Sequence, residues 1–287
     1  MFDILRYELY KMKRLKKVYF CAFAINFLPL LILFILTVLF FKGMIYRDFG
    51  VMQQMFVKEF GGGIMGTLVV LLSFFSWSSW FFQTIIAGEL IAKEFENKSI
   101  KLMLLMPFKR LTIYLGKLLS TIVFFVVNML IYLSLCALIG LALDYVFGFK
   151  VFSLIDYHLL VRLCNAYFVI NFSYIALVFL VSIFARSAES TMAFTIFATF
   201  ALKLIDAVIL LFGKIDIIPI AAAEWLVKYS YLKSCEVIKY EKLIRMVDTG
   251  DYLNMPLAFD MLQVNIIYSI AFLFIGYQIF KRKEEKG

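Results

Sequence analysis

Six long apolar segments dominate this sequence, and each has the length that an α-helix needs to cross a lipid bilayer. A transmembrane helix requires about 20 mostly apolar residues. A membrane β-barrel would instead require segments of about ten residues in which apolar and polar side chains alternate, and the run LPLLILFILTVLFF has no such alternation. The hydrophobic share of 64% also exceeds that of soluble domains. We predict an all-α integral membrane protein, a single transmembrane domain over residues 1–287, with spans at 19–41, 67–87, 118–143, 163–185, 191–212 and 261–280.

Positive charge gathers on one side of this topology. With the N-terminus inside the cell, the cytoplasmic segments contain 17 basic and 8 acidic residues, which accounts for the whole net charge of +9. The outer loops contain 11 residues of each sign. Because cytoplasmic loops of membrane proteins carry an excess of Lys and Arg, we predict a multi-pass protein of the plasma membrane with cytoplasmic N- and C-termini. This topology explains the basic charge without a nucleic-acid partner.

Residues 1–17 form a basic, amphipathic segment before the first span. Leu5, Leu9 and Met12 fall on one face of a helix. The basic side chains Arg6 and Lys13 can then reach lipid head groups. We expect an interfacial helix with membrane lipid as a partner, and a merely basic flank that sets the topology is the alternative. The segment lacks the features of a cleavable signal peptide.

The loop at 88–117 is longer and more polar than a connection between two spans requires. Its first charged residues are expected to extend the second span as a polar helix: Glu89, Lys93, Glu96 and Lys101. Ser99 is then placed to cap a short helix at 100–106, which Pro107 ends. A short amphipathic helix of this kind either docks into a groove of another protein or rests on lipid, and periodicity alone leaves both open.

Four short motifs lie in this loop and at the N-terminus: EFENKSIK at 94–101, LLMPFKR at 104–110, IYLGK at 113–117 and YELYKMKR at 7–14. The three loop motifs resemble the first cytoplasmic loop of ABC-2 type transporter permeases. The N-terminal motif resembles the branch of that family linked to peptide export and lantibiotic immunity. The departures are small, because Ser99 replaces the usual Thr, Lys98 a commoner Gly, and Lys109 a Ser.

The resemblance implies half of an exporter, in which two permease subunits work with two separate ATP-binding subunits. Residues 1–17 would be the connecting helix and 99–106 the coupling helix, with outer or re-entrant helices within the extracellular segment 213–260. ATP and Mg would bind in the partner subunit, and the second permease would be another copy, giving a homodimer, or a paralogue. The residues expected to couple this chain to the ATPase subunit are Glu94, Glu96, Lys98, Ser99, Ile100, Lys101, Leu104, Pro107 and Arg110.

The chain itself carries no recognisable nucleotide or catalytic motif. A phosphate-binding loop needs G-x-x-x-x-G-K-[ST], but the glycine-rich residues 61–67 lack the lysine, and Lys117 is followed by Leu118. No Ser, His and Asp arrangement offers an active site. His158 is the only histidine and the four cysteines have no paired spacing. We therefore expect no catalytic residue, metal site or cofactor in this chain.

Polar side chains inside the predicted spans suggest a route for cargo: Ser73, Ser76, Gln83, Asn128 and Asn171. Such groups either line a path or join helices, and the sequence leaves both open. Lys203 and Asp206 of the fifth span are expected to pair. Beyond that span, Pro219 precedes predicted helices at 221–233 and 236–247.

We therefore expect a permease subunit of an ATP-driven exporter that moves an amphipathic peptide or hydrophobic compound. The many Phe and Met residues would offer adaptable apolar walls to such a ligand. The alternatives are an ABC-2 exporter of lipid, polysaccharide or ions, and a membrane enzyme or receptor unrelated to ABC transport.

Overall fold

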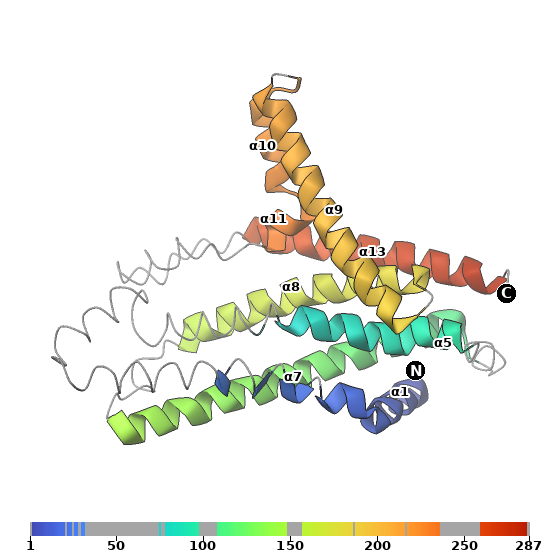
Figure 1. The fold of residues 1–287 in the computed structure, drawn as a ribbon, viewed down its shortest axis with the longest axis vertical. Coiled ribbons are helices and arrows are strands. Elements are labelled where there is room, and N and C mark those ends of the chain that lie inside the picture. The colour runs from blue at the N-terminus through green and yellow to red at the C-terminus, as the bar shows by residue number, and fades with distance from the viewer. Residues whose placement is uncertain are drawn as a thin grey trace.

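The computed structural model describes residues 2–20, 22–24, 26–27, 30–31, 75, 78–97, 108–147, 157–185, 187–215, 217–235 and 259–285. Within these ranges every element is a helix. All the long helices except one run side by side as an elongated bundle, and both chain termini lie at one end of it (Figure 1). The all-α architecture predicted from the sequence is confirmed for this part of the chain.

Helix α1, Phe2–Arg14, lies against the start of α7, Arg110–Phe147. The helix stops at Leu15, and the described residues between 16 and 31 are helical again. Ile4, Glu8 and Met12 are buried at helical spacing. Met12 belongs to the face expected to be apolar, but Ile4 and Glu8 are buried in place of Leu5 and Leu9, which are half-buried, because α1 packs against protein. Its basic residues Arg6 and Lys13 are exposed, as the amphipathic pattern indicates.

Residues 78–96 form one continuous helix with a change of winding in the middle. The α-helical residues 78–87 lead into a π-helical turn, η1, Gly88–Ala92, and then into α5, Lys93–Glu96. The expected extension of the second span through Glu96 is present, and Asn97 turns the chain. The extension is less solvated than its charges predict, because Glu89 and Glu94 are buried.

Helix α8, Tyr157–Phe184, occupies the centre of the bundle, and 72% of its most apolar window is buried. It packs along α13, Phe259–Glu285, and contacts η1 and α9. Aromatic rings join these helices, since Tyr114 of α7 lies 6.1 Å from Phe179 and 5.6 Å from Phe280 between ring centroids. The hydrophobic core therefore runs between α7, α8 and α13.

Helix α9, Ala188–Lys214, begins with a capping box in which Ser187 and Ser190 exchange hydrogen bonds. It starts beside η1 and then projects away from the other long helices (Figure 1). Only 6% of its apolar window is buried in the chain. Helix α10, Ile220–Lys228, folds back along it, and α11, Tyr231–Cys235, contacts α13.

Two expectations for this region were wrong in detail. Residues 221–233 form two helices rather than one, because Ser230 caps the second by accepting the Lys233 N–H, and the Tyr229 carbonyl accepts the Tyr268 hydroxyl. Asp206 does not pair with Lys203 among the ion pairs of the described residues. Its carboxylate instead accepts a hydrogen bond from Ser230 at 2.8 Å. The predicted helix at 236–247 lies outside the described residues.

Four described helices are long and apolar enough to cross a membrane: Arg110–Leu138, Leu160–Phe184, Ala188–Lys214 and Leu262–Arg282. They correspond to the predicted spans 118–143, 163–185, 191–212 and 261–280. The first of these helices begins before the predicted span, because residues 110–117 are already helical and this helix packs against α1. The predicted span 19–41 and the start of span 67–87 lie largely outside the described residues, so the number six stays a prediction.

Candidate functional site

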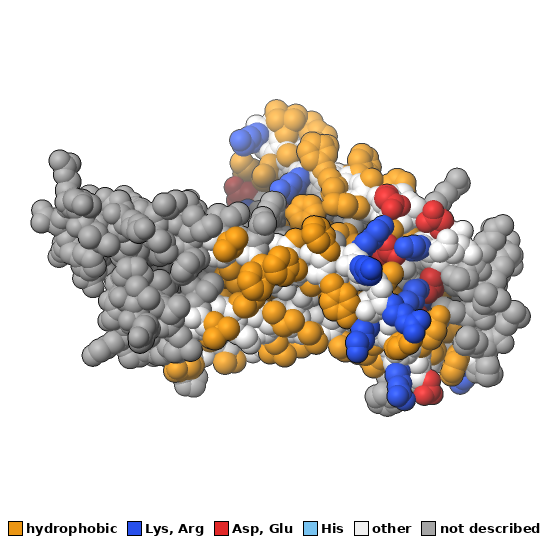
Figure 2. Space-filling model, turned by 60° about the horizontal axis from the view of Figure 1, so that its bottom comes forward, with side chains coloured by type: hydrophobic (Ala, Val, Ile, Leu, Met, Phe, Trp, Pro, Cys, Tyr) orange, Lys and Arg blue, Asp and Glu red, His pale blue; other side chains and the backbone are white. Residues whose placement is uncertain are grey.

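Charged side chains gather at one end of the bundle, and apolar side chains cover the part next to it (Figure 2). This charged end comprises α1, α5, the start of α7 and the last turns of α13, which lie near both termini (Figure 1). Such a separation is expected where a bundle leaves the hydrocarbon core of a membrane, since charged groups are costly within it.

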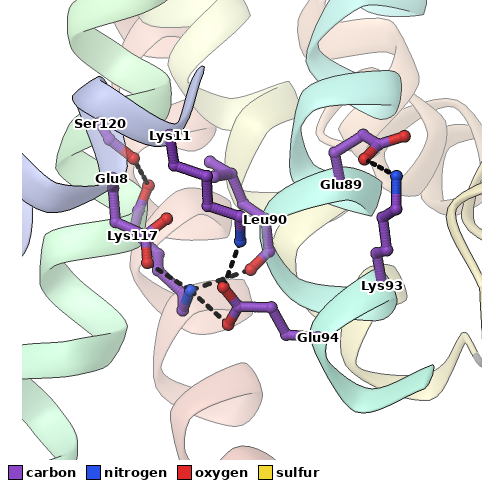
Figure 3. Close-up of polar contacts among 8 residues, drawn as sticks. All are labelled: Glu8, Lys11, Glu89, Leu90, Lys93, Glu94, Lys117 and Ser120. Atoms are coloured by element: carbon purple, nitrogen blue, oxygen red, sulfur yellow. Dashed lines mark hydrogen bonds and ion pairs between the residues drawn. The ribbon is translucent and has the colours of Figure 1, made fainter. Parts of the chain in front are cut away.

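Beneath this surface, four charged residues from three helices form one buried cluster, named here the charge quartet: Glu8 and Lys11 from α1, Glu94 from α5 and Lys117 from α7 (Figure 3). The Lys117 Nζ lies 2.6 Å from Glu8 Oε1 and 2.6 Å from Glu94 Oε2. It also donates to the carbonyl of Leu90, at 3.0 Å. Lys11 donates to the other oxygen of Glu94. The two cations and two anions balance.

Burial sets the electrostatics of the quartet. The side chains of Glu8 and Lys117 are 0% exposed, and Glu94 is 6% exposed. Burial raises the pKa of Glu8 above its ordinary value of 4.5, although Lys117 beside it acts in the opposite direction. Burial alone would lower the pKa of Lys11, but the Glu94 carboxylate outweighs it, and the net shift is upward from 10.5. The quartet thus stabilises the charged form of Lys11, whereas burial disfavours the ionised form of Glu8.

Local features of the three helices position these groups. Gly116 allows α1 to approach α7, because a Cβ there would meet the Ile4 Cγ2 at 2.6 Å. The carbonyl that accepts from Lys117 belongs to Leu90, in the π-helical turn η1, and such turns often occur at functional sites. Beside the quartet, Lys93 and Glu89 form an ion pair at 2.6 Å on the same helix (Figure 3).

The structure places three of the residues predicted to couple the chain to an ATPase subunit. Glu94 lies at the centre of the quartet, whereas Glu96 is exposed. Arg110 begins α7 and donates to the carbonyl of Lys281, at 3.3 Å, so it ties α7 to α13. The other predicted coupling residues lie outside the described residues: Lys98, Ser99, Ile100, Lys101, Leu104 and Pro107.

Three of the residues predicted for a cargo path lie in the interior of the bundle. Gln83 and Ser79 both donate to the Asn171 Oδ1, at 3.0 and 2.6 Å, and thereby join the 78–96 helix to α8. Asn128 of α7 accepts from Asn26 at 2.9 Å. These contacts join helices within one chain. Ser73 and Ser76 lie outside the described residues.

Glu8, Lys11 and Lys117 are not among the site residues that the sequence predicts. A signal was present, because all three occur in the motifs YELYKMKR and IYLGK that carry the family resemblance. Glu8 and Lys117 lie 109 positions apart in the chain, and the ion pair between them brings the two motifs together. The motifs thus contain residues that join helices in the interior as well as residues at the surface.

A known protein family matches most of this chain. The family model described as "ABC-2 family transporter protein" matches residues 4–202 of the 287. The matched range contains the whole charge quartet, α7, α8 and half of α9. No curated protein matches the chain. Proteins of the matched family are membrane components of ABC transporters, whose ATP-binding subunits are separate. This chain belongs to the ABC-2 family of transporter proteins, as a permease subunit.

Proposed function

We propose that the chain is the membrane half of an exporter, and that a separate ATP-hydrolysing subunit docks on the loop at 97–109 and moves it through the charge quartet. The observation that carries the proposal is the position of the quartet at both ends of this loop. Glu94 lies three residues before Asn97, where the loop begins, and Lys117 lies two turns into the helix that follows it.

The quartet is suited to transmit a movement because its ion pairs are difficult to separate. A buried charge that loses its partner costs several kcal/mol, about 3–5 in measured cases. A shift of the docking loop would therefore move α5 and the start of α7 together. Glu8 and Lys11 would carry the same shift to α1, because each holds one of the two shared partners. The three helices are expected to respond to the ATPase subunit as one unit.

The direction of transport and the cargo are proposed from the sequence resemblance. The resemblance of YELYKMKR to the peptide-export branch favours an amphipathic peptide or a hydrophobic compound. An exporter of lipid, polysaccharide or ions is the alternative within the family. We further propose that two copies of the chain assemble as a homodimer in the plasma membrane, with both termini in the cytoplasm.

The docking surface is tested in a complex assembled with the ATPase subunit. We predict that the double variant Ile100→Asp with Leu104→Asp inserts normally but loses the stimulation of ATP hydrolysis by cargo and loses transport. The physical reason is that two carboxylates would be placed in an apolar contact. Transport at the wild-type rate by a variant that still assembles would contradict the proposed docking.

The quartet is tested by conservative changes that remove the connection but not the docking loop. Glu94→Gln should keep binding of the ATPase subunit, measured by co-purification, and reduce coupled transport. The matched control is Glu96→Gln, an exposed neighbour two residues further along the same helix. Equal transport by both variants would remove the quartet from the mechanism and leave the docking proposal intact.

A further inference from the structure

A small pocket lies in the bundle interior, away from the charge quartet. Its walls come from the helical residues between 16 and 31, from the 78–96 helix and from α7. The polar residues of the wall are Asn26, Ser79, Gln83, Thr121 and Asn128, and the remaining wall is apolar, with Phe75 and Phe125 among its rings. Neither the family match nor the coupling mechanism assigns a role to this pocket.

Gln83 leaves a hydrogen-bond acceptor unused at this pocket. Its side chain is 2% exposed, and its Nε2 donates to the Asn171 Oδ1. The orientation of Asn171 is itself fixed, because its Nδ2 donates to the Tyr167 carbonyl at 2.8 Å. Gln83 must therefore present its amino group to Asn171. The Gln83 Oε1 is left buried without a partner among the described residues.

The pair of Asn26 and Asn128 leaves a second acceptor. The Asn26 Nδ2 donates to the Asn128 Oδ1, and the Asn26 Oδ1 has no partner among the described residues, although Asn26 is only 4% exposed. If both amides were rotated, the oxygen of Asn128 would be left instead, so one carbonyl oxygen remains in either case. Two buried carbonyl oxygens of the pocket wall thus lack a hydrogen-bond donor. A buried acceptor without a donor destabilises the fold.

The size of the pocket and the absence of charge in its described wall define the group that can donate to these two oxygens. The free volume of the pocket is about 10 Å³, near the lower limit for holding one water-sized group. None of the residues that form its described wall is acidic or basic, so an ammonium would be buried without a counter-ion and a carboxylate would face carbonyl oxygens. We propose that this pocket binds one uncharged O–H donor. A water molecule has two protons and can donate to both the Gln83 Oε1 and the oxygen left by the Asn26 and Asn128 pair, whereas an alcohol hydroxyl has one proton and donates to the Gln83 Oε1.

Two sources supply this chemistry, a water molecule or the hydroxyl end of a long apolar molecule that enters from the membrane. The inference rests on the family assignment only in treating these helices as membrane-embedded, and it needs no ATPase subunit. A binding assay on the purified permease therefore fails or succeeds independently of the proposed coupling function.

The experiment uses a long-chain alcohol with a photoreactive diazirine beside its hydroxyl, and the permease in an amine-oxide detergent, which lacks hydroxyl groups. Labelled peptides are mapped by mass spectrometry, with dodecanol, dodecylamine and dodecane as competitors. We expect labelling of the pocket walls that dodecanol displaces and the other two do not. Gln83→Leu should reduce it about tenfold, as the loss of one buried hydrogen bond predicts. Gln278→Leu, at an exposed position of α13, should not.

Gln83→Leu is expected to fold, because Asn171 keeps its hydrogen bond from Ser79, and Asn26→Leu provides a second variant of the same site. A high-resolution experimental map can show an oxygen-sized peak within hydrogen-bond distance of the Gln83 Oε1 even when no labelling occurs. The occupant is then water, which is also an uncharged O–H donor, and this result supports the proposal. Equal displacement by dodecylamine or dodecane would overturn the proposal. The absence of both specific labelling and an ordered oxygen would overturn it as well.

Discussion

Lys117 has two carboxylates within ion-pair distance and donates to a main-chain carbonyl, and its contacts reach α1, α5 and η1. Glu8 and Glu94 share it, and its positive charge opposes the effect of burial, which raises the pKa of Glu8. The quartet is therefore asymmetric. Removal of Lys117, which pairs with two carboxylates, should cost more stability than removal of Glu8, which pairs with one lysine.

The first prediction concerns the loss of this cation. Lys117→Met keeps most of the side-chain volume but leaves Glu8 and Glu94 facing each other in a buried site. We expect the free energy of unfolding in detergent to fall by about 3–5 kcal/mol. Lys214→Met, at the exposed end of α9, is the control and should change it by less than about 0.5 kcal/mol. An equal effect of the two substitutions would show that the quartet contributes little to stability.

The second prediction concerns pH. The pKa of Glu8 is higher in the folded protein than its ordinary 4.5, so the folded state binds its proton more tightly than the unfolded state does. Stability contributed by this group is complete below pH 4.5 and is lost as pH rises through the folded pKa. We expect Glu8→Gln to match the wild type near pH 4.5 and to be the more stable of the two at neutral pH.

Thermal unfolding of the two proteins across this pH range provides the measurement. Lys11 does not contribute to the trend, because its pKa is raised from 10.5 and its stabilisation persists throughout the acidic and neutral range. A Glu8→Gln variant that becomes less stable than the wild type as pH rises would mean that Lys117 outweighs burial at Glu8.

At the scale of elements, the contact between η1 and α9 depends on a residue without a side chain. A Cβ at Gly88 would lie 3.1 Å from both the Cα and the carbonyl oxygen of Ala188, and these backbone atoms cannot rotate away. Ala188 follows the cap of α9 directly, so the start of that helix would have to move. The approach of η1 to α9 therefore fixes where α9 leaves the bundle.

The third prediction follows from this contact. Gly88→Ala gains helix propensity of at most about 1 kcal/mol, but overpacking against a backbone costs about 1–3 kcal/mol. We expect a net loss of stability in chemical unfolding. Adding Ala188→Gly should not restore it, since the crowded atoms belong to the backbone. Restoration in the double variant would instead identify the Ala188 methyl group, 3.4 Å away, as the obstacle.

At the scale of the whole molecule, the chain divides the work of a transporter with another protein. Its charged end carries the charge quartet, and its long helices supply the membrane part, while the sequence contains no phosphate-binding loop. The outward face of α9 is almost wholly apolar and unburied in the single chain, which suits contact with lipid or with a second permease.

The fourth prediction concerns this division. Purified permease, free of other subunits, should hydrolyse no ATP above a preparation from cells that lack the gene. Addition of the ATPase subunit should produce hydrolysis that depends on an intact loop at 97–109. Robust hydrolysis by the permease alone, retained after Lys117→Met, would require a nucleotide site that the sequence does not reveal.

The amino-acid sequence by itself determined the membrane class, the family and the positions of the long helices. Hydrophobic length and charged flanks are local properties, so four predicted spans agree with described helices. The motif residues Glu94 and Arg110 are also recognised locally, as parts of a loop that resembles the family, and their role in coupling stays a prediction.

Only the tertiary structure decided which of these residues meet. Glu8 and Lys117 form their ion pair across 109 positions of the chain, and no periodicity in either helix indicates a charged partner so far away. The same reason applies to Gln83 and Asn171, whose amide side chains form a hydrogen bond that joins two helices. A sequence records which side chains need a buried partner, but helix packing selects the partner, because that choice depends on distances that exist only after folding.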